Sequence, residues 1–164
     1  MAPSELEDRF IEIINGHASL MYKVCHLYVS RKEEIEDLYQ EIVYQLWKSF
    51  PKFRNESKIS TWIYRVALNT AITNLSKKKA VYSSITQEEL KISDQHSSSV
   101  QYETNETVAK ALNLLTNNEK SLILLHVEGY NNNEIAEIIG ISLNNVAVKI
   151  NRIKNKLQTI IKKL

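Results

Sequence analysis

Apolar residues recur at steps of three and four along most of the chain, which is the spacing of one face of an α-helix. In the first half this spacing predicts helices over residues 4–15, 17–29, 32–50 and 60–79. In the second half it predicts helices over 105–115, 116–129 and 134–139, and a last helix that follows Ser142. The pattern therefore predicts an all-α fold.

Local signals mark where several of these helices begin and end. Ser4 with Glu7, and Thr116 with Glu119, have the spacing of a capping box and predict two helix starts. Pro51 ends the third helix, because a residue that precedes proline is disfavoured in the helical conformation.

One segment, residues 80–104, interrupts the helical pattern. It is rich in Ser, Gln and acidic residues, and it has no sustained apolar stripe beyond a short helix expected near 86–90. The chain is thus predicted to form two small helical domains, 1–79 and 105–164, joined by a flexible linker over 80–104.

The most specific pattern lies in residues 133–157, which predict two helices joined by a tight turn. Gly140 stands where the first helix needs a residue that tolerates positive φ, and Ser142 is a favourable N-cap for the second. Ala136, Gly140 and Val146 follow the small, turn, apolar order of a helix-turn-helix. The core-facing stripe of the second helix is predicted to be Val146, Ile150, Ile153 and Leu157. The pattern favours a helix that enters a DNA major groove, with an ordinary helical hairpin as the alternative.

Charge supports a nucleic-acid partner through its distribution rather than its total. The chain has 164 residues and a net charge of only +2. Residues 51–79 carry seven basic groups and one acidic group, and 142–164 carry six basic groups and none that is acidic. The two basic segments alternate with two acidic ones, so two separate basic surfaces are expected.

Other classes of protein find little support in the sequence. No run of about 18 apolar residues is present to span a membrane, and the N-terminus has no apolar signal region, which favours a cytoplasmic protein. Cys25 is the only cysteine, so no internal disulfide forms, and we expect it to be a small buried hydrophobe. The four histidines lack metal-ligand spacing and no catalytic motif is found, so no cofactor, metal or small-molecule substrate is expected and the chain is not predicted to be an enzyme.

A second motif occupies residues 37–79, where aromatic and basic side chains alternate. Rings that stack on bases, together with cations that track phosphates, suit single-stranded nucleic acid. Asn69 lies two helical turns after Trp62, where its amide could read a base edge. The alternative is that Trp62 and Tyr64 are core residues of a helical bundle, and one tryptophan can do both.

With these motifs the chain resembles the extracytoplasmic-function (ECF) group of bacterial RNA polymerase sigma factors, of the sigma-70 family. In the first domain the resemblance is carried by residues 37–41 (DLYQE), 46–47 (LW), 53–54 (FR), 60–67 (STWIYRVA) and Asn69. In the second it is carried by residues 134–137 (EIAE), 140–142 (GIS), Val146, Lys149, Arg152 and Lys154.

The resemblance implies that the protein directs RNA polymerase to promoters. The first domain would bind the clamp helices of the polymerase's largest subunit through Asp37, Gln40, Glu41, Leu46 and Trp47. It would hold the melted −10 element through Arg54, Lys58, Trp62, Arg65 and Asn69. The second domain would read the −35 element with Asn144, Asn145, Ala147, Val148, Lys149, Asn151 and Arg152.

Departures from the family pattern and one competing function stay open. The family commonly has Gly-Thr where this chain has Asn144 and Asn145, and often has a basic residue at Ala147 and a small polar one at Val148. The base preference of relatives therefore does not carry over.

Many relatives are held inactive by an anti-sigma factor, and the sequence leaves open whether this chain has one. The alternative function is a stand-alone helix-turn-helix regulator, which would bind duplex promoter DNA without polymerase.

Overall fold

A computed structural model of the chain describes residues 2–84 and 106–164, and every regular element in these ranges is helical, which confirms the all-α prediction. The chain divides into two compact units, residues 1–99 and 100–164. In chain order the elements are α1 (Pro3–Gly16), α2 (Ala18–Tyr28), α3 (Lys32–Ser49), the 3-10 turn η1 (Phe50–Lys52), α4 (Ile59–Ser84), α5 (Glu106–Asn113), α6 (Asn117–Val127), α7 (Asn132–Ile139) and α8 (Leu143–Lys163).

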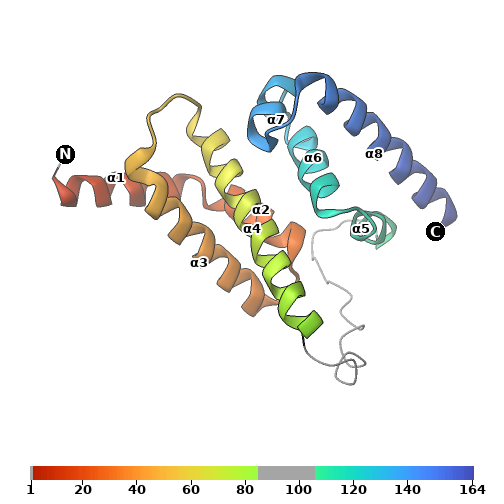
Figure 1. The fold of residues 1–164 in the computed structure, drawn as a ribbon, viewed down its shortest axis with the longest axis horizontal. Coiled ribbons are helices and arrows are strands. Elements are labelled where there is room, and N and C mark those ends of the chain that lie inside the picture. Colours follow the sequence, from red (N-terminus) through yellow and green to blue (C-terminus); the bar gives the residue numbers. More distant parts are fainter. Residues whose placement is uncertain (1, 85–105) are drawn as a thin grey trace. The chain divides into compact units, whose positions relative to one another are not determined.

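The first unit is built on the mutual packing of α2, α3 and α4. In Figure 1, α3 and α4 run side by side and α2 lies behind α4. The predicted stripe of α3 is its core face: Ile35, Leu38, Ile42 and Leu46 are all buried. From α4 the core receives Ile63, Tyr64, Ala67, Leu68 and Ala71. Burying each large side chain of this kind contributes roughly 1.5–3 kcal/mol, so α3 and α4 are held firmly against each other.

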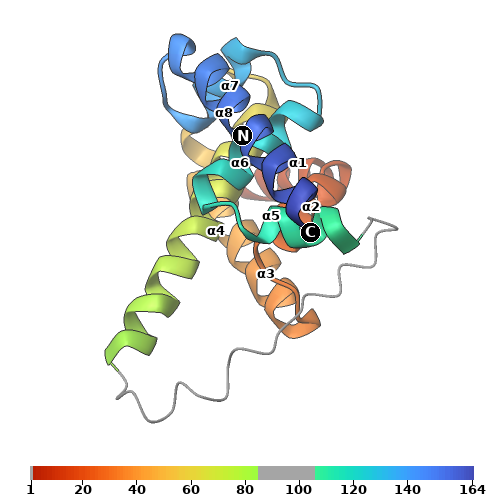
Figure 2. The ribbon, with the colours of Figure 1, turned by 90° about the vertical axis from the view of Figure 1, so that its right-hand side faces the viewer.

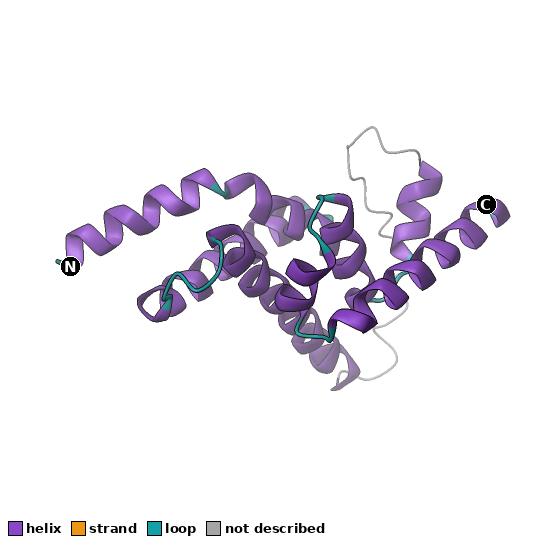
Figure 3. Ribbon diagram, turned by 90° about the horizontal axis from the view of Figure 1, so that it is seen from above, coloured by secondary structure: helices purple, strands orange, loops and turns teal. Residues whose placement is uncertain are grey.

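Helix α1 lies at one end of this bundle and joins it through aromatic packing. The ring of Phe10 meets Trp47 edge-on, with centroids 5.0 Å apart, and lies 5.3 Å from Phe50. The first turns of α1 extend away from the bundle, as Figures 1 and 3 show. One face of Trp47 is therefore committed to the packing of α1.

Two boundaries in the first unit differ from the prediction. The capping box at Ser4 and Glu7 is wrong: α1 begins at Pro3, and the Ala2 amide donates to the Glu5 carboxylate over 3.0 Å. Proline at the first position of the helix explains the earlier start, because its fixed φ suits that position and it lacks an amide that would need a partner.

The second boundary concerns the end of α4. This helix runs to Ser84, past the predicted end at residue 79, so the first residues of the predicted linker are helical. Residues 76–81 near its end are exposed, and Figure 2 shows the backbone of α4 diverging from α3 there. The rest of the predicted linker, 85–104, including the short helix expected near 86–90, lies outside the described residues.

Cys25 is buried within the first unit, as its sequence context predicted. The side chain has no exposed surface, and this burial raises the pKa of its thiol to about 12. It packs as a small apolar residue.

The second unit contains the predicted helix-turn-helix, formed by α7 and α8. Gly140 ends α7 with φ of 78°, the left-handed conformation that the sequence indicated. Ser142 takes the N-cap position of α8, although its side chain accepts no capping hydrogen bond. Val146, Ile150 and Ile153 are buried against α6 and α7, and Leu157 is half-buried.

The capping box at Thr116 is confirmed and has a further function. The Thr116 hydroxyl accepts from the Glu119 amide, and the Glu119 carboxylate accepts from the Thr116 amide over 2.8 Å. The same carboxylate lies 2.8 Å from the ammonium of Lys156 on α8. Partial burial alone would raise the pKa of Glu119, but the hydrogen bonds from Lys156 and Thr116 hold it below its ordinary value. This side chain therefore both caps α6 and fastens α8 to it.

Replacing Glu119 with alanine should destabilise the second unit by about 1–2 kcal/mol, because a helix cap and a partly exposed ion pair are lost together. A carboxyl with a lowered pKa stabilises the fold above its ordinary pKa of 4.5, and that contribution is lost as pH falls through the lowered value. The difference between wild type and Glu119→Ala should shrink accordingly as pH falls below 4.5.

Urea unfolding followed by the NMR signals of α6 measures this difference at several pH values. The matched control is Glu106→Ala, which removes a carboxylate 2.7 Å from Lys110 in an ion pair that is largely exposed and should add almost nothing. Equal midpoints for Glu119→Ala and wild type at pH 7 would contradict the prediction.

Candidate functional site

Helix α3 turns one complete face to solvent, opposite its buried stripe. We call this surface the α3 outer face; its exposed residues are Glu33, Glu36, Asp37, Gln40, Tyr44, Trp47 and Lys48. Three of the five predicted polymerase contacts, Asp37, Gln40 and Trp47, belong to it. It is acidic toward the start of the helix and aromatic toward its end.

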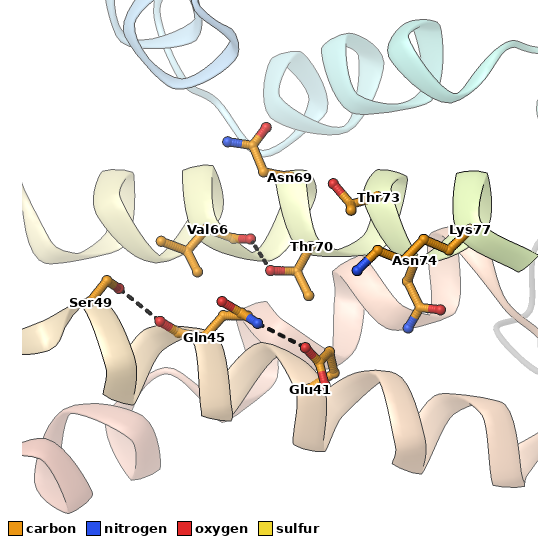
Figure 4. A pocket seen from close by; sticks show the side chains of 9 residues that line it. All are labelled: Glu41, Gln45, Ser49, Val66, Asn69, Thr70, Thr73, Asn74 and Lys77. Atoms are coloured by element: carbon orange, nitrogen blue, oxygen red, sulfur yellow. Dashed lines mark hydrogen bonds between the residues drawn. The ribbon is translucent and has the colours of Figure 1, made fainter.

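The other two predicted polymerase contacts lie elsewhere on α3. Glu41 is half-buried at the edge of the outer face and points toward α4, where it accepts a hydrogen bond of 2.9 Å from the Gln45 amide (Figure 4). Leu46 has no exposed surface at all. Leu46 therefore holds α3 in the core and has no surface to offer to a partner in this conformation.

The predicted base-stacking residue Trp62 is covered by the protein's own rings. Only 8% of its surface is exposed, and the ring of Phe53 stacks on it at 4.7 Å with an interplanar angle of 28°. Phe50 packs beside it at 6.1 Å. Of the two interpretations left open by the sequence, the core interpretation describes Trp62 in this structure.

The remaining predicted −10 residues are more accessible than Trp62. Arg54 and Lys58 are exposed in the loop between η1 and α4, Arg65 is half-buried, and Asn69 is exposed on α4. The loop also contains Asn55 with φ of 56°, a left-handed conformation that asparagine adopts more readily than most residues. Stacking of Phe53 on Trp62 fixes the start of this loop, so the two exposed cations stand on a positioned segment.

A groove of about 560 Å³ lies between α3 and α4 in the first unit. Of the residues predicted to hold the −10 element, only Asn69 lines this groove. Within it, the Thr70 hydroxyl donates to the Val66 carbonyl and the Ser49 hydroxyl to the Gln45 carbonyl (Figure 4). Its lining residues are Glu41, Gln45, Ser49, Val66, Asn69, Thr70, Thr73, Asn74 and Lys77.

The neighbouring basic residues Lys77 and Lys78, near the end of α4, make different contacts. Lys78 lies 3.8 Å from Glu34 at the start of α3, and Glu34 is also 3.1 Å from Arg31. A hydrogen bond from Arg31, opposed by partial burial, keeps the pKa of Glu34 below its ordinary value. Lys77 instead lines the groove. Along the groove the lining runs from Ser49 and Val66, past Gln45 and Glu41, to Asn74 and Lys77 (Figure 4).

Helix α8 presents all of its predicted DNA-reading residues to solvent. They are Asn144, Asn145, Ala147, Val148, Lys149, Asn151 and Arg152, and each is exposed. The buried stripe of Val146, Ile150 and Ile153 occupies the opposite side of the helix. Helix α8, which is described over its full length, contains no acidic residue, so its exposed face is polar and positively charged.

Metal binding has no support in the described ranges, 2–84 and 106–164. No three His, Cys, Asp or Glu side chains lie together there in a way that could hold an ion. Among the same residues, no helix is long and apolar enough to cross a membrane.

Each of the two units matches the profile of a known protein family. Residues 13–81 match the profile of sigma-70 region 2, and residues 105–157 match that of sigma-70 region 4. The first match contains α3, the loop and α4, and the second contains the helix-turn-helix. The chain belongs to the sigma-70 family of RNA polymerase sigma factors.

Curated relatives place the chain more narrowly, in the ECF group of that family. It is 31% identical over 150 residues to the ECF RNA polymerase sigma-E factor of Haemophilus influenzae, covering 81% of this chain and 79% of that protein. It is 25% identical over 168 residues to the ECF RNA polymerase sigma factor SigW of Bacillus subtilis, covering 93% of this chain and 88% of that protein. The chain is thus a promoter-directing factor for transcription initiation.

Solved structures agree with this fold. The sigma factor RpoE, in complex with the anti-sigma factor NepR from Bartonella quintana, superposes with a TM-score of 0.68 at 19% identity, covering 96% of this chain and 97% of that one. CnrH, in complex with the cytosolic domain of CnrY, gives a TM-score of 0.67 at 18% identity and covers 96% of this chain and 90% of the other.

Proposed function

We propose that the α3 outer face, with Glu41 at its edge, binds the clamp helices of the polymerase's largest subunit. The face is supported from behind by Leu46 and the other buried residues of α3, so it is rigid before it meets a partner. The observation that carries the proposal is the exposure of Asp37 and Gln40 on a helix whose other side is fully used by the core. Acidic groups at this surface would attract a basic partner surface and orient it.

We also propose that the exposed side of α4 and its groove take the unpaired strand of the −10 element. Separating promoter DNA costs about 1.4 kcal/mol per base-pair step, and a factor without nucleotide hydrolysis must offset that cost by binding the unpaired bases. Asn69 can pair with a base edge, while Arg54, Lys58 and Lys77 supply charge for the backbone phosphates. In this proposal Trp62 contributes mainly by holding Phe53 and the loop in place.

The second unit would place α8 in the major groove of the −35 element. Arg152 and Asn151 carry the groups that pair with guanine and adenine, and Val148 can contact a thymine methyl. Lys149 flanks this face and is positioned for a phosphate. The basic, acid-free surface of α8 favours the approach to DNA.

The regulation of this protein, its lack of a catalytic step and its place in the cell are inferred from its assignment to the ECF sigma factors. One solved structure with this fold is a complex of a sigma factor with the anti-sigma factor NepR, which supports an anti-sigma partner for this chain as well. Promoter opening by such a factor draws on binding energy, with no catalytic step of its own. A protein that works on bacterial RNA polymerase acts in the cytoplasm. The stand-alone regulator remains the alternative, and no structural observation favours it.

A combined substitution tests the polymerase interface. Gln40→Ala with Glu41→Ala should weaken binding of the full chain to purified core polymerase severalfold, since two polar contacts are lost without disturbing the core. Fluorescence anisotropy of a labelled chain titrated with core enzyme measures this affinity, and run-off transcription measures its consequence. Thr73→Ala, which removes an exposed polar group from α4, is the control and should leave binding to core polymerase unchanged. If the double variant binds as tightly as wild type, these residues lie outside the interface.

A further inference from the structure

Tyr44 is an exposed aromatic side chain that the fold does not use. More than half of its surface, 56%, is open to solvent. Within the described parts of the chain its ring stacks on no other ring, and its hydroxyl makes no hydrogen bond. Leaving so large an apolar ring in water gains nothing for the fold, which makes its position on the surface informative.

The other exposed aromatic residues of the first unit have partners. Tyr22, 41% exposed, stacks on Tyr39 at 4.3 Å with an interplanar angle of 17°. Trp47, 36% exposed, packs edge-on against Phe10. Tyr44 alone among these three has no aromatic partner, so ring packing within the fold does not account for its position.

The position of Tyr44 on α3 links it to the proposed polymerase interface. It lies four residues after Gln40 and three after Glu41, so its side chain is one helical turn along the same surface. Lys48 follows one turn later, and Asp37 precedes by two. Tyr44 therefore stands in the middle of the α3 outer face, with Asp37, Gln40 and Lys48 around it and Trp47 at the next turn.

An aromatic centre within a polar border is the arrangement that concentrates binding energy in protein interfaces. A tyrosine that enters a pocket of the partner is desolvated completely, while the surrounding polar groups exclude water and set the orientation. Because Glu36 and Asp37 are acidic, we expect basic groups of the partner beside that pocket. The partner surface would thus be apolar where it meets the ring and positively charged where it meets the first half of α3.

We propose that Tyr44 is the principal anchoring side chain of the α3 outer face and inserts into an apolar, basic-bordered pocket of core RNA polymerase. This inference rests on the proposed function of α3 and adds a residue to it. The ring supplies the contact area, and the acidic and amide groups around it select the register. A fully desolvated ring predicts that affinity depends on the aromatic side chain far more than on its hydroxyl.

The test compares three full-length variants with wild type for binding to purified core RNA polymerase by the anisotropy titration described above. Tyr44→Ala should weaken binding by about tenfold or more, as expected when a buried interface anchor is truncated. Tyr44→Phe should stay close to wild type, because the ring is retained. Tyr22→Ala removes a matched exposed tyrosine away from the α3 outer face and should have little effect. Thermal unfolding of Tyr44→Ala should stay close to that of wild type, since more than half of the side chain is already exposed to solvent.

The outcomes separate this inference from the function on which it rests. If Gln40→Ala with Glu41→Ala weakens binding and Tyr44→Ala does not, the anchor is another residue and the α3 interface stands. If Tyr22→Ala weakens binding as much as Tyr44→Ala, the assignment to Tyr44 fails. If none of the α3 variants weakens binding, the proposed interface and its anchor fail together.

Discussion

Replacing Arg152 with alanine is expected to weaken recognition at one position of the −35 element by about 1–3 kcal/mol, leaving other positions unchanged. Arg152 is exposed on the face of α8 that we propose to meet DNA, and the buried stripe on the opposite face holds the helix in the core. Its fork of donors matches two acceptors of a guanine, and loss of that pair removes discrimination at one base pair only. The measurement is the affinity of the reconstituted holoenzyme for promoters that carry single base-pair changes in the upstream element.

Lys149 on the same helix provides the matched control. Lys149→Ala should weaken binding to every promoter alike and lower the salt dependence by about one counterion, because an ammonium on the flank of the helix contacts phosphate. The series should therefore be measured at two or more salt concentrations. Equal losses on all promoters for Arg152→Ala would make Arg152 a phosphate contact and shift base readout to Asn151 or to DNA shape.

Asn69→Ala is expected to reduce open-complex formation on duplex promoters by a comparable amount, about 1–3 kcal/mol if its amide pairs with an unpaired base. The side chain is exposed at the groove between α3 and α4, beside polar groups that could accommodate a base (Figure 4). The defect should be smaller on a template with a pre-melted bubble whose bases are changed, because neither melting nor that base contact is then required.

Permanganate footprinting on both templates measures this effect. Asn74→Ala provides the comparison within the same groove, one turn further along α4. If wild type and Asn69→Ala open the duplex equally well, Asn69 does not take part in capturing the unpaired strand. A defect of equal size on both templates would instead indicate damage to polymerase binding.

The second unit was the most predictable part of the chain, because each of its main features is local. Gly140 is followed by an N-cap and then by an apolar stripe, and these signals lie within a single stretch of sequence. The conformation of Gly140 and the burial of Val146 follow directly from them. The Asn131–Glu134 capping box of α7 was not predicted, although its spacing could have indicated it.

The first unit was less predictable wherever distant segments meet. Trp62 is buried because Phe50 and Phe53, from the preceding turn and loop, fold onto it, and a helical pattern alone cannot reveal this. The groove depends on the separation of α3 and α4, which no local signal sets. Tyr44 was missed because a lone aromatic on a polar face stands out only once the core face of the helix is known.

The burial of Cys25 has a practical consequence for the energetics of the chain. Thiol reagents attack the thiolate, so a thiol that is buried and has a raised pKa reacts only when the surrounding structure opens. Because the chain has one cysteine, its labelling rate reports the opening free energy of the first unit and is silent about the second. Measured with and without core polymerase, the same rate would give the stabilisation that polymerase binding confers on that unit.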